Sequence, residues 1–151
     1  MSMRRRGFPP IVLGLFLAAC AGGGGDPVPP AVTVSAARAQ VMPGMGHGAA
    51  YFTVHNAGPQ DDRLLAVETP AARVAELHES LEQDGVMRMV AHPDGLPLPA
   101  GGDLVLAPGG KHVMLIDPQL PAGARSLPLT LRFERAGELA VDAELMGMGG
   151  S

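Results

Sequence analysis

The chain contains two histidine–methionine combinations whose side chains are soft metal ligands. Ten residues separate His78 from Met89, and His112 and Met114 form an H-x-M pair. Imidazole nitrogen combined with thioether sulfur favours monovalent copper over zinc, calcium or magnesium. The single cysteine, Cys20, lies far from all four residues in the sequence. The four side chains therefore predict a copper(I) site that contains no thiolate.

A β-hairpin over residues 73–91 is expected to bring the first two ligands together. If residues 82–85 form a four-residue loop, His78 lies directly opposite Met89, with Cβ atoms about 4.5–5.5 Å apart. The two-residue period of a strand puts Met87 on the same face as Met89. Met87 is therefore an auxiliary ligand candidate.

The same period places His112 and Met114 on one face of a later strand, with Val113 turned to the other side. Each residue also has an ordinary structural role, because a methionine in a strand more often fills the core than binds a metal. Two histidine–methionine combinations are a rarer accident than any single residue. The combination favours a metal site and leaves the core alternative open.

Short apolar segments broken by Gly, Pro and Asp predict an all-β domain. Nine segments are expected to be strands: residues 31–41, 49–55, 63–69, 73–80, 86–91, 103–106, 112–116, 127–133 and 138–145. No segment has a sustained 3.6-residue period bounded by helix caps. The pattern is typical of an antiparallel sandwich or barrel, with Tyr51, Phe52 and Phe133 as aromatic anchors of the core.

Residues 1–19 have the pattern of a bacterial signal peptide. Three arginines at residues 4–6 precede an apolar run at residues 11–18, which is too short to span a bilayer. The run ends in Leu-Ala-Ala-Cys, which resembles a lipobox, where cleavage before the cysteine is followed by acylation of its thiol. The sequence predicts lipidation at Cys20, and two or more acyl chains would anchor the protein stably.

The expected organisation after cleavage is a Gly/Pro-rich linker at residues 20–31, one domain at residues 32–146 and a flexible tail at residues 147–151. Removing residues 1–19, with their three arginines, leaves 8 basic and 15 acidic side chains. That balance argues against binding to nucleic acid. No nucleophile elbow, phosphate-binding loop or acid–base carboxylate pair stands out, so we expect no enzymatic activity.

Two methionine clusters lie outside the main pattern. Met42, Met45 and His47 lie in a glycine-rich loop that would cap a copper site or receive the ion in transit; the alternative is a flexible loop with incidental methionines. Met146 and Met148 would form a ligand-bearing tail or a frayed end. The sequence leaves both alternatives open.

Four motifs are specific enough for comparison with a known family: Glu-Leu-His-Glu at residues 76–79, Gly-Val-Met-Arg-Met at 85–89, Leu-Pro-Ala-Gly-Gly at 98–102 and Leu-Ala-Pro-Gly-Gly-Lys-His-Val-Met-Leu at 106–115. They closely resemble the PCuAC family of periplasmic copper chaperones. The resemblance covers about residues 32–145. It implies a cupredoxin-like Greek-key β-sandwich, in agreement with the strand pattern.

The family pattern is a histidine, ten residues, a methionine, about twenty-one residues and then H-x-M. It carries over to His78, Met89, His112 and Met114 as the implied copper ligands. The second gap holds twenty-two residues here, and the extra residue falls among loop signals, where an insertion costs little. Glu79 stands where many relatives place a second methionine.

The resemblance implies a Cu(I) chaperone of the bacterial periplasm. Its implied partners are subunit II of cytochrome c oxidase, a Sco-type thiol protein, or both. A site without thiolate binds Cu(I) less tightly than a cysteine site, which allows transfer to such an acceptor. Affinity is expected to weaken as pH falls, because the imidazoles must be neutral to bind.

Three alternatives remain open. A copper-sequestering or resistance lipoprotein would hold the ion at the same site without delivering it. A copper redox enzyme is disfavoured, because the soft ligand set favours Cu(I) over Cu(II). In a non-metal envelope binding module, the methionines would fill the core.

Overall fold

The computed structural model describes residues 31–42 and 44–147, in which every regular element is a β-strand. The strands are β1 (Val32–Val41), β2 (His47–Asn56), β3 (Asp62–Glu68), β4 (Ala72–Gln83), β5 (Val86–Ala91), β6 (Leu96–Leu98), β7 (Asp103–Val105), β8 (Lys111–Pro118), β9 (Ser126–Phe133) and β10 (Gly137–Leu145). These ranges contain no helix of the length and apolarity that a membrane span requires. The predicted signal peptide, Cys20 and Met148 lie outside the described residues.

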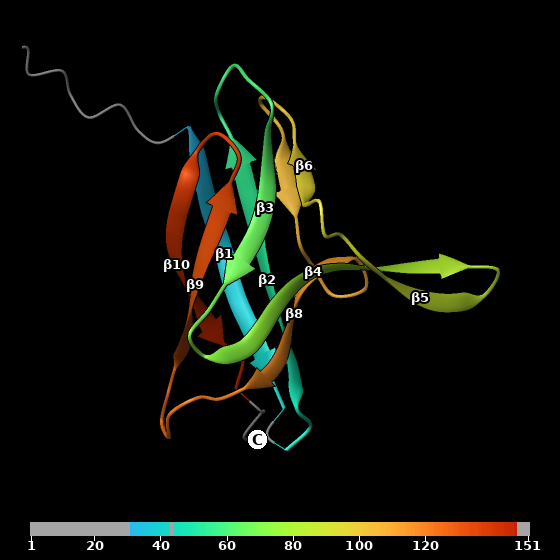
Figure 1. Cartoon of the computed structure of the whole chain (residues 1–151), viewed down its shortest axis with the longest axis vertical. Coiled ribbons are helices and arrows are strands. Elements are labelled where there is room, and N and C mark those ends of the chain that lie inside the picture. The colour runs from blue at the N-terminus through green and yellow to red at the C-terminus, as the bar shows by residue number, and fades with distance from the viewer. Residues whose placement is uncertain (1–30, 43, 148–151) are drawn as a thin grey trace, which may run out of the picture.

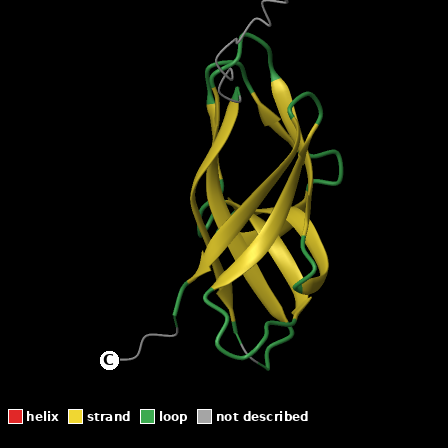
Figure 2. Ribbon diagram, turned by 90° about the vertical axis from the view of Figure 1, so that its left-hand side faces the viewer, coloured by secondary structure: helices red, strands yellow, loops and turns green. Residues whose placement is uncertain are grey.

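The strands follow one hydrogen-bonded path that folds into a β-sandwich (Figures 1 and 2). Their order is β5-β4-β8-β2-β1-β10-β9-β3-β6, and β7 also pairs with β2. The pair β1–β10 is parallel and the other pairs are antiparallel. The prediction of an all-β sandwich is confirmed.

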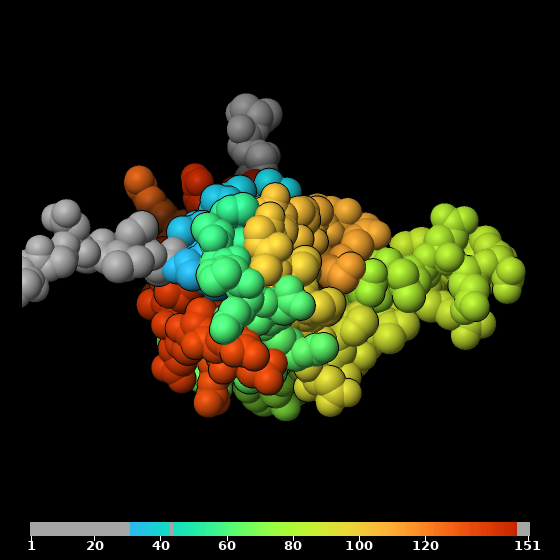
Figure 3. All heavy atoms as spheres, turned by 90° about the horizontal axis from the view of Figure 1, so that it is seen from above, coloured from blue at the N-terminus to red at the C-terminus, as the bar shows by residue number. Residues whose placement is uncertain are grey.

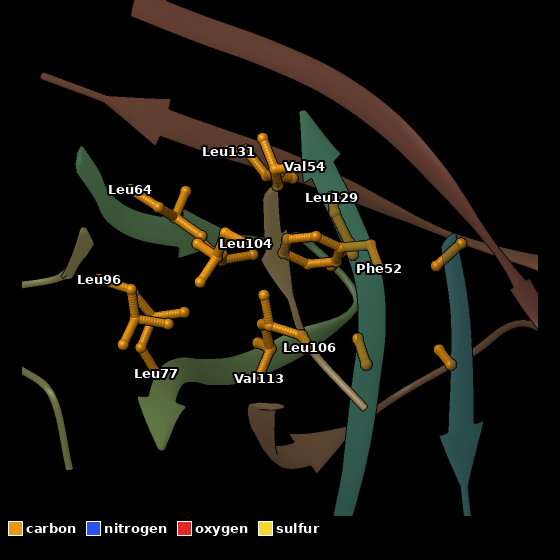
Figure 4. Packing of buried hydrophobic residues seen from close by; sticks show 14 of the residues in the cluster. Phe52, Val54, Leu64, Leu77, Leu96, Leu104, Leu106, Val113, Leu129 and Leu131 are labelled. Carbon is orange, nitrogen blue, oxygen red and sulfur yellow. The ribbon is translucent and has the colours of Figure 1, made fainter. Parts of the chain in front are cut away.

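Aliphatic side chains fill the core between the layers (Figure 4). Strand β9 shows the rule most clearly, since its burial alternates with a period of two and buries Leu127, Leu129, Leu131 and Phe133. Each fully buried leucine contributes roughly 1.5–3 kcal/mol by leaving water. Core burial therefore fixes which face of each strand points outward.

The aromatic anchors divide between the two faces of their strands. Phe52 and Phe133 belong to the core, as predicted. Tyr51 is also buried, but it lines a surface cavity on the opposite face from its neighbour Phe52. Arg38 covers the Tyr51 ring, with its guanidinium carbon 5.9 Å from the ring centroid. Tyr51 thus supports a surface site and not the interior.

Strand β6 is absent from the sequence prediction. It has only three residues and contains Pro97, which weakens a strand pattern but is tolerated on an edge strand. Leu96 and Leu98 are 1% and 0% exposed, and β6 pairs with β3. Gly95 leads into β6 with a φ of +83°.

Alanine at Gly95 is expected to destabilise the fold more than alanine at Gly123. Both glycines have a left-handed backbone conformation, with φ of +83° and +79°, so both substitutions introduce a backbone strain of about 1 kcal/mol. A Cβ at Gly95 would also overlap the backbone oxygen of Leu64, whereas a Cβ at Gly123 would meet nothing within 4 Å. We expect G95A to lose at least ~2 kcal/mol more than G123A in denaturant unfolding, because backbone must shift. Equal losses would contradict the close approach of β3.

Candidate metal centre

Strands β4 and β8 place the two predicted histidine ligands next to each other. His78 pairs directly with His112 in the antiparallel register. The centroids of the two imidazole rings are 6.1 Å apart, and the ring planes are tilted by 46°. Their neighbours Leu77 and Val113 are buried in the core, so the strand period turns both histidines to the outer face. Met114 lies on that face, two residues beyond His112.

Hydrogen bonds determine which nitrogen of each imidazole can bind a metal. Nε2 of His78 donates to Oε2 of Glu76 at 2.9 Å, and Nδ1 of His112 donates to the carbonyl oxygen of Gly110 at 3.0 Å. Because carboxylate and carbonyl oxygens only accept, each neutral ring presents a lone pair on its other nitrogen.

The free nitrogen of His78 has an unusual environment. Its Nδ1 is buried and has no hydrogen-bond partner among the described residues. Buried polar atoms are rarely left without a partner, so the unpaired Nδ1 of His78 suggests a functional role. A metal-binding histidine typically shows this arrangement, with one nitrogen available to the ion and the other held by a carboxylate. Glu76 is that carboxylate here.

The hairpin that carries Met89 has a shorter turn than the sequence prediction gives. Asp84 and Gly85 have φ of +54° and +75° and form a two-residue turn, so that Gln83 pairs with Val86. Asp-Gly is a strong signal for such a turn, because both central residues need positive φ. The predicted four-residue loop is therefore wrong.

The shorter turn moves Met89 by two residues relative to His78. His78 faces Ala91, and Met89 faces Ser80, so the predicted direct pairing is wrong. A shift of two residues preserves the face on which a side chain lies. Met89 therefore remains on the same face of the sheet as His78, one diagonal step away.

A cavity of about 330 Å³ lies on this outer face. Met89, His112 and Met114 line it from β5 and β8, and Met42 and His47 line it from the β1–β2 side. His78 does not line the cavity and lies beside His112. Within residues 31–42 and 44–147, no three His, Cys, Asp or Glu side chains form a metal-binding group.

The other candidate ligands are more dispersed. Met87 is 59% exposed on the hairpin, outside the cavity lining. Met45 is 58% exposed and does not line the cavity, although its carbonyl oxygen accepts a hydrogen bond from Nδ1 of His47 at 2.8 Å. Met146 follows β10 and lies beside β1, where its backbone N–H donates to the carbonyl oxygen of Ala39.

Sequence reasoning missed Glu76 as a partner of the site. The signal was available, because Glu76 and His78 are two residues apart and so share a strand face. Glu76 also lies directly opposite Met114 in the β4–β8 register. It therefore supplies a negative charge next to two of the predicted ligands.

Comparison with known proteins supports this fold. Residues 32–145 match the family described as "Putative lipoprotein LpqE-like". "Putative lipoprotein Lxx21020" of Leifsonia xyli subsp. xyli (strain CTCB07) is 36% identical over 91 residues, which are 60% of this chain and 55% of that protein. The chain thus spans about half the length of this curated relative.

Solved structures of PCuAC domains and of DR1885 are similar in fold to this chain. The copper-bound PCuAC domain from PmoF2 has a TM-score of 0.64 and 25% identity, covering 78% of this chain and 93% of that domain. The apo PCuAC domain from PmoF1 has a TM-score of 0.62 and 29% identity, covering 78% and 94%. CuI-DR1885 from Deinococcus radiodurans has a TM-score of 0.51 and 32% identity, covering 76% and 74%.

Glu79 connects the base of the hairpin to β8 and to the following turn. Its carboxylate accepts a hydrogen bond from Nε2 of His92 at 2.9 Å and lies 3.3 Å from Nζ of Lys111. Burial raises the pKa of Glu79, but the hydrogen bonds and charges of His92 and Lys111 outweigh burial and lower that pKa below 4.5. At residue 79, where the family resemblance made a second methionine ligand conceivable, this chain has a carboxylate that anchors the hairpin.

Glu79→Gln is expected to remove part of the acid sensitivity of the metal-free fold. Because the pKa of Glu79 is lowered by folding, its ionised form stabilises the fold above 4.5, and this contribution is lost as pH falls through the lowered value. Thermal unfolding from pH 7 to pH 3 should show a smaller loss of stability in E79Q than in the wild type. Glu82→Gln is the matched control, since Glu82 is exposed on the same strand. Identical pH slopes for the wild type and E79Q would contradict the anchoring role.

Proposed function

Since this chain belongs to the LpqE-like lipoprotein family, we propose that it is a Cu(I) carrier of the bacterial cell envelope. The resemblance to PCuAC domains predicted from the motifs is confirmed by the family match and by the solved structures. Two of those structures are named as copper-bound or Cu(I) forms, which supports copper as the cargo. The proposed role is binding and delivery without catalysis.

The proposed Cu(I) ligands are His78, His112, Met89 and Met114. The observation that carries the proposal is the buried Nδ1 of His78, which has no partner among the described residues and lies beside a second histidine with a free nitrogen. Cu(I) accepts soft thioether sulfur readily, so the two methionines complete a set of four. Glu76 would hold the His78 ring in place and offset the charge of the ion.

The exposure of the ligands supports delivery. His112 is 7% exposed, whereas Met89 is 54% exposed on a hairpin that projects from the molecule (Figures 1 and 3). An incoming ligand from an acceptor would replace Met89 first, while the two less exposed imidazoles still hold the ion. An acceptor with thiolates binds Cu(I) more tightly, so transfer proceeds downhill.

The finer steps of the proposal follow from the family resemblance. The acceptor would be subunit II of cytochrome c oxidase, a Sco-type thiol protein, or both, in the periplasm. The lipoprotein names of the family and of the Leifsonia xyli relative support an anchor at Cys20. Acyl chains on Cys20 would hold the domain near membrane-bound acceptors.

The mature protein is expected to bind Cu(I) through the proposed ligands in an anaerobic titration against a chromophoric Cu(I) chelator. His112→Ala should weaken binding at least ~10-fold by removing a ligand, and Glu76→Ala by about 10-fold by releasing the His78 ring. His55→Ala is the matched control, because His55 is exposed and bonded to Asp103, away from the cavity. Unchanged affinity in H112A would exclude the proposed site.

Delivery and sequestration differ in what happens when an acceptor is added. The Cu(I)-loaded protein is expected to transfer its ion to a copper-free oxidase subunit II domain or a Sco-type protein within minutes. Met89→Leu should speed transfer several-fold, because it opens in advance the coordination position that the ligand of the acceptor enters. If the ion stays on this protein after the mixture with the acceptor has reached equilibrium, the protein sequesters copper and does not deliver it. The control is the acceptor mixed with free Cu(I), which shows that the acceptor can be loaded.

A further inference from the structure

The side of the cavity opposite β5 carries a second pair of soft ligands. Met42 follows β1 and His47 begins β2, and both line the cavity that Met89, His112 and Met114 line from the other side. They come from a segment more than sixty residues before the H-x-M pair, yet strand order brings them together, because β8 lies next to β2 and β2 next to β1.

Strand register explains why the two pairs share a face. Ala49 pairs with Met114 across β2–β8 and with Gln40 across β1–β2. His47 lies two residues before Ala49, and Met42 lies two residues after Gln40, so both keep the face of Met114. His47 and Met114 are diagonal neighbours, a separation that a long side chain spans.

His47 and His112 are held in the same way. In each, Nδ1 donates to the carbonyl oxygen two residues earlier, Met45 at 2.8 Å and Gly110 at 3.0 Å. Both neutral rings therefore carry the proton on Nδ1 and present a lone pair on Nε2. Two imidazoles with the same free nitrogen line one cavity, although they belong to different strands.

The cavity leaves room between the two pairs. Ala49 lies in the row between His47 and Tyr51 and has a side chain too short to fill that space. Met42 is 43% exposed, so its thioether is accessible from solvent as well as from the cavity. An ion near His47 would thus be open to solvent, unlike one near the buried His112.

We propose that Met42 and His47 form a second, weaker Cu(I) station in this cavity, next to the four-ligand site. This inference rests on the proposed function, because it assumes that Cu(I) is the cargo. Two soft ligands are enough to hold Cu(I), which has a filled d shell and no strong geometric demand. The station is weaker because it has fewer ligands and because the first ion repels the second.

The test counts Cu(I) equivalents bound to the mature chain in detergent, with a chromophoric chelator as competitor. The wild type is expected to bind two equivalents, the second at least tenfold more weakly than the first. The double variant Met42→Leu, His47→Gln should lose the second equivalent and keep the affinity of the first. His55→Gln is the control, since it removes an exposed imidazole from the same strand outside the cavity.

Methyl NMR with Ag(I) as a Cu(I) substitute locates each equivalent. The first is expected to shift the Met89 and Met114 methyl resonances, and the second the Met42 resonance. One equivalent in the wild type, or a second equivalent that survives in the double variant, would overturn the second station and leave the first site standing. Absence of any binding would instead remove both this inference and the proposed function.

Discussion

The antiparallel pairing of β4 with β8 is the constraint on which the rest of the site depends. One register places Leu77 beside Val113 in the core and His78 beside His112 on the outer face. A slip of one residue would turn the apolar pair to solvent and bury the imidazoles, and a slip of two would separate the histidines. The core that stabilises the fold therefore also specifies the ligand geometry.

The sheet organises the site as a series of rows across neighbouring strands. Because β8 lies between β4 and β2, its H-x-M pair can meet side chains from both directions: Glu76 and His78 from β4, Ala49 and Tyr51 from β2. Hydrogen bonds then orient each ring through one nitrogen and leave its other nitrogen available. Every residue involved sits on a strand or at its end, which holds the side chains in place more firmly than a loop would.

Much of the fold and part of the site could be predicted from the sequence. Alternating apolar residues were enough for the all-β sandwich, because burial of one strand face imposes a period of two. The predicted hairpin register was wrong because it assumed a four-residue loop. The actual turn is Asp84-Gly85, which has the residue types that positive φ demands. Strand β6 was not predicted, because three residues with a central Pro97 are too few to show an alternating strand pattern.

The sequence raised the alternative that the loop with Met42 and His47 caps the copper site, but it could not show which residues meet Met114. That meeting depends on the order β8-β2-β1, in which strands distant in the chain become neighbours. Local patterns report which face a residue occupies but not which strand lies next to it. The E-x-H spacing of Glu76 and His78 was local, and so it was predictable in principle.

The distribution of burial over the ligands decides how such a site would work. The imidazoles are the less exposed members: His112 is 7% exposed, and Nδ1 of the half-buried His78 is buried, while its Nε2 is bonded to a carboxylate. Met89 is exposed on the β4–β5 hairpin. At the base of this hairpin, Glu79 forms an ion pair with Lys111 and accepts a hydrogen bond from His92. Displacing an exposed, uncharged ligand costs little, whereas displacing His78 from the ion would leave its buried Nδ1 without a partner again. In the proposed carrier, exchange at the methionine and retention at the histidines would therefore follow from the same packing, and that asymmetry would suit an ion that must be held until an acceptor arrives.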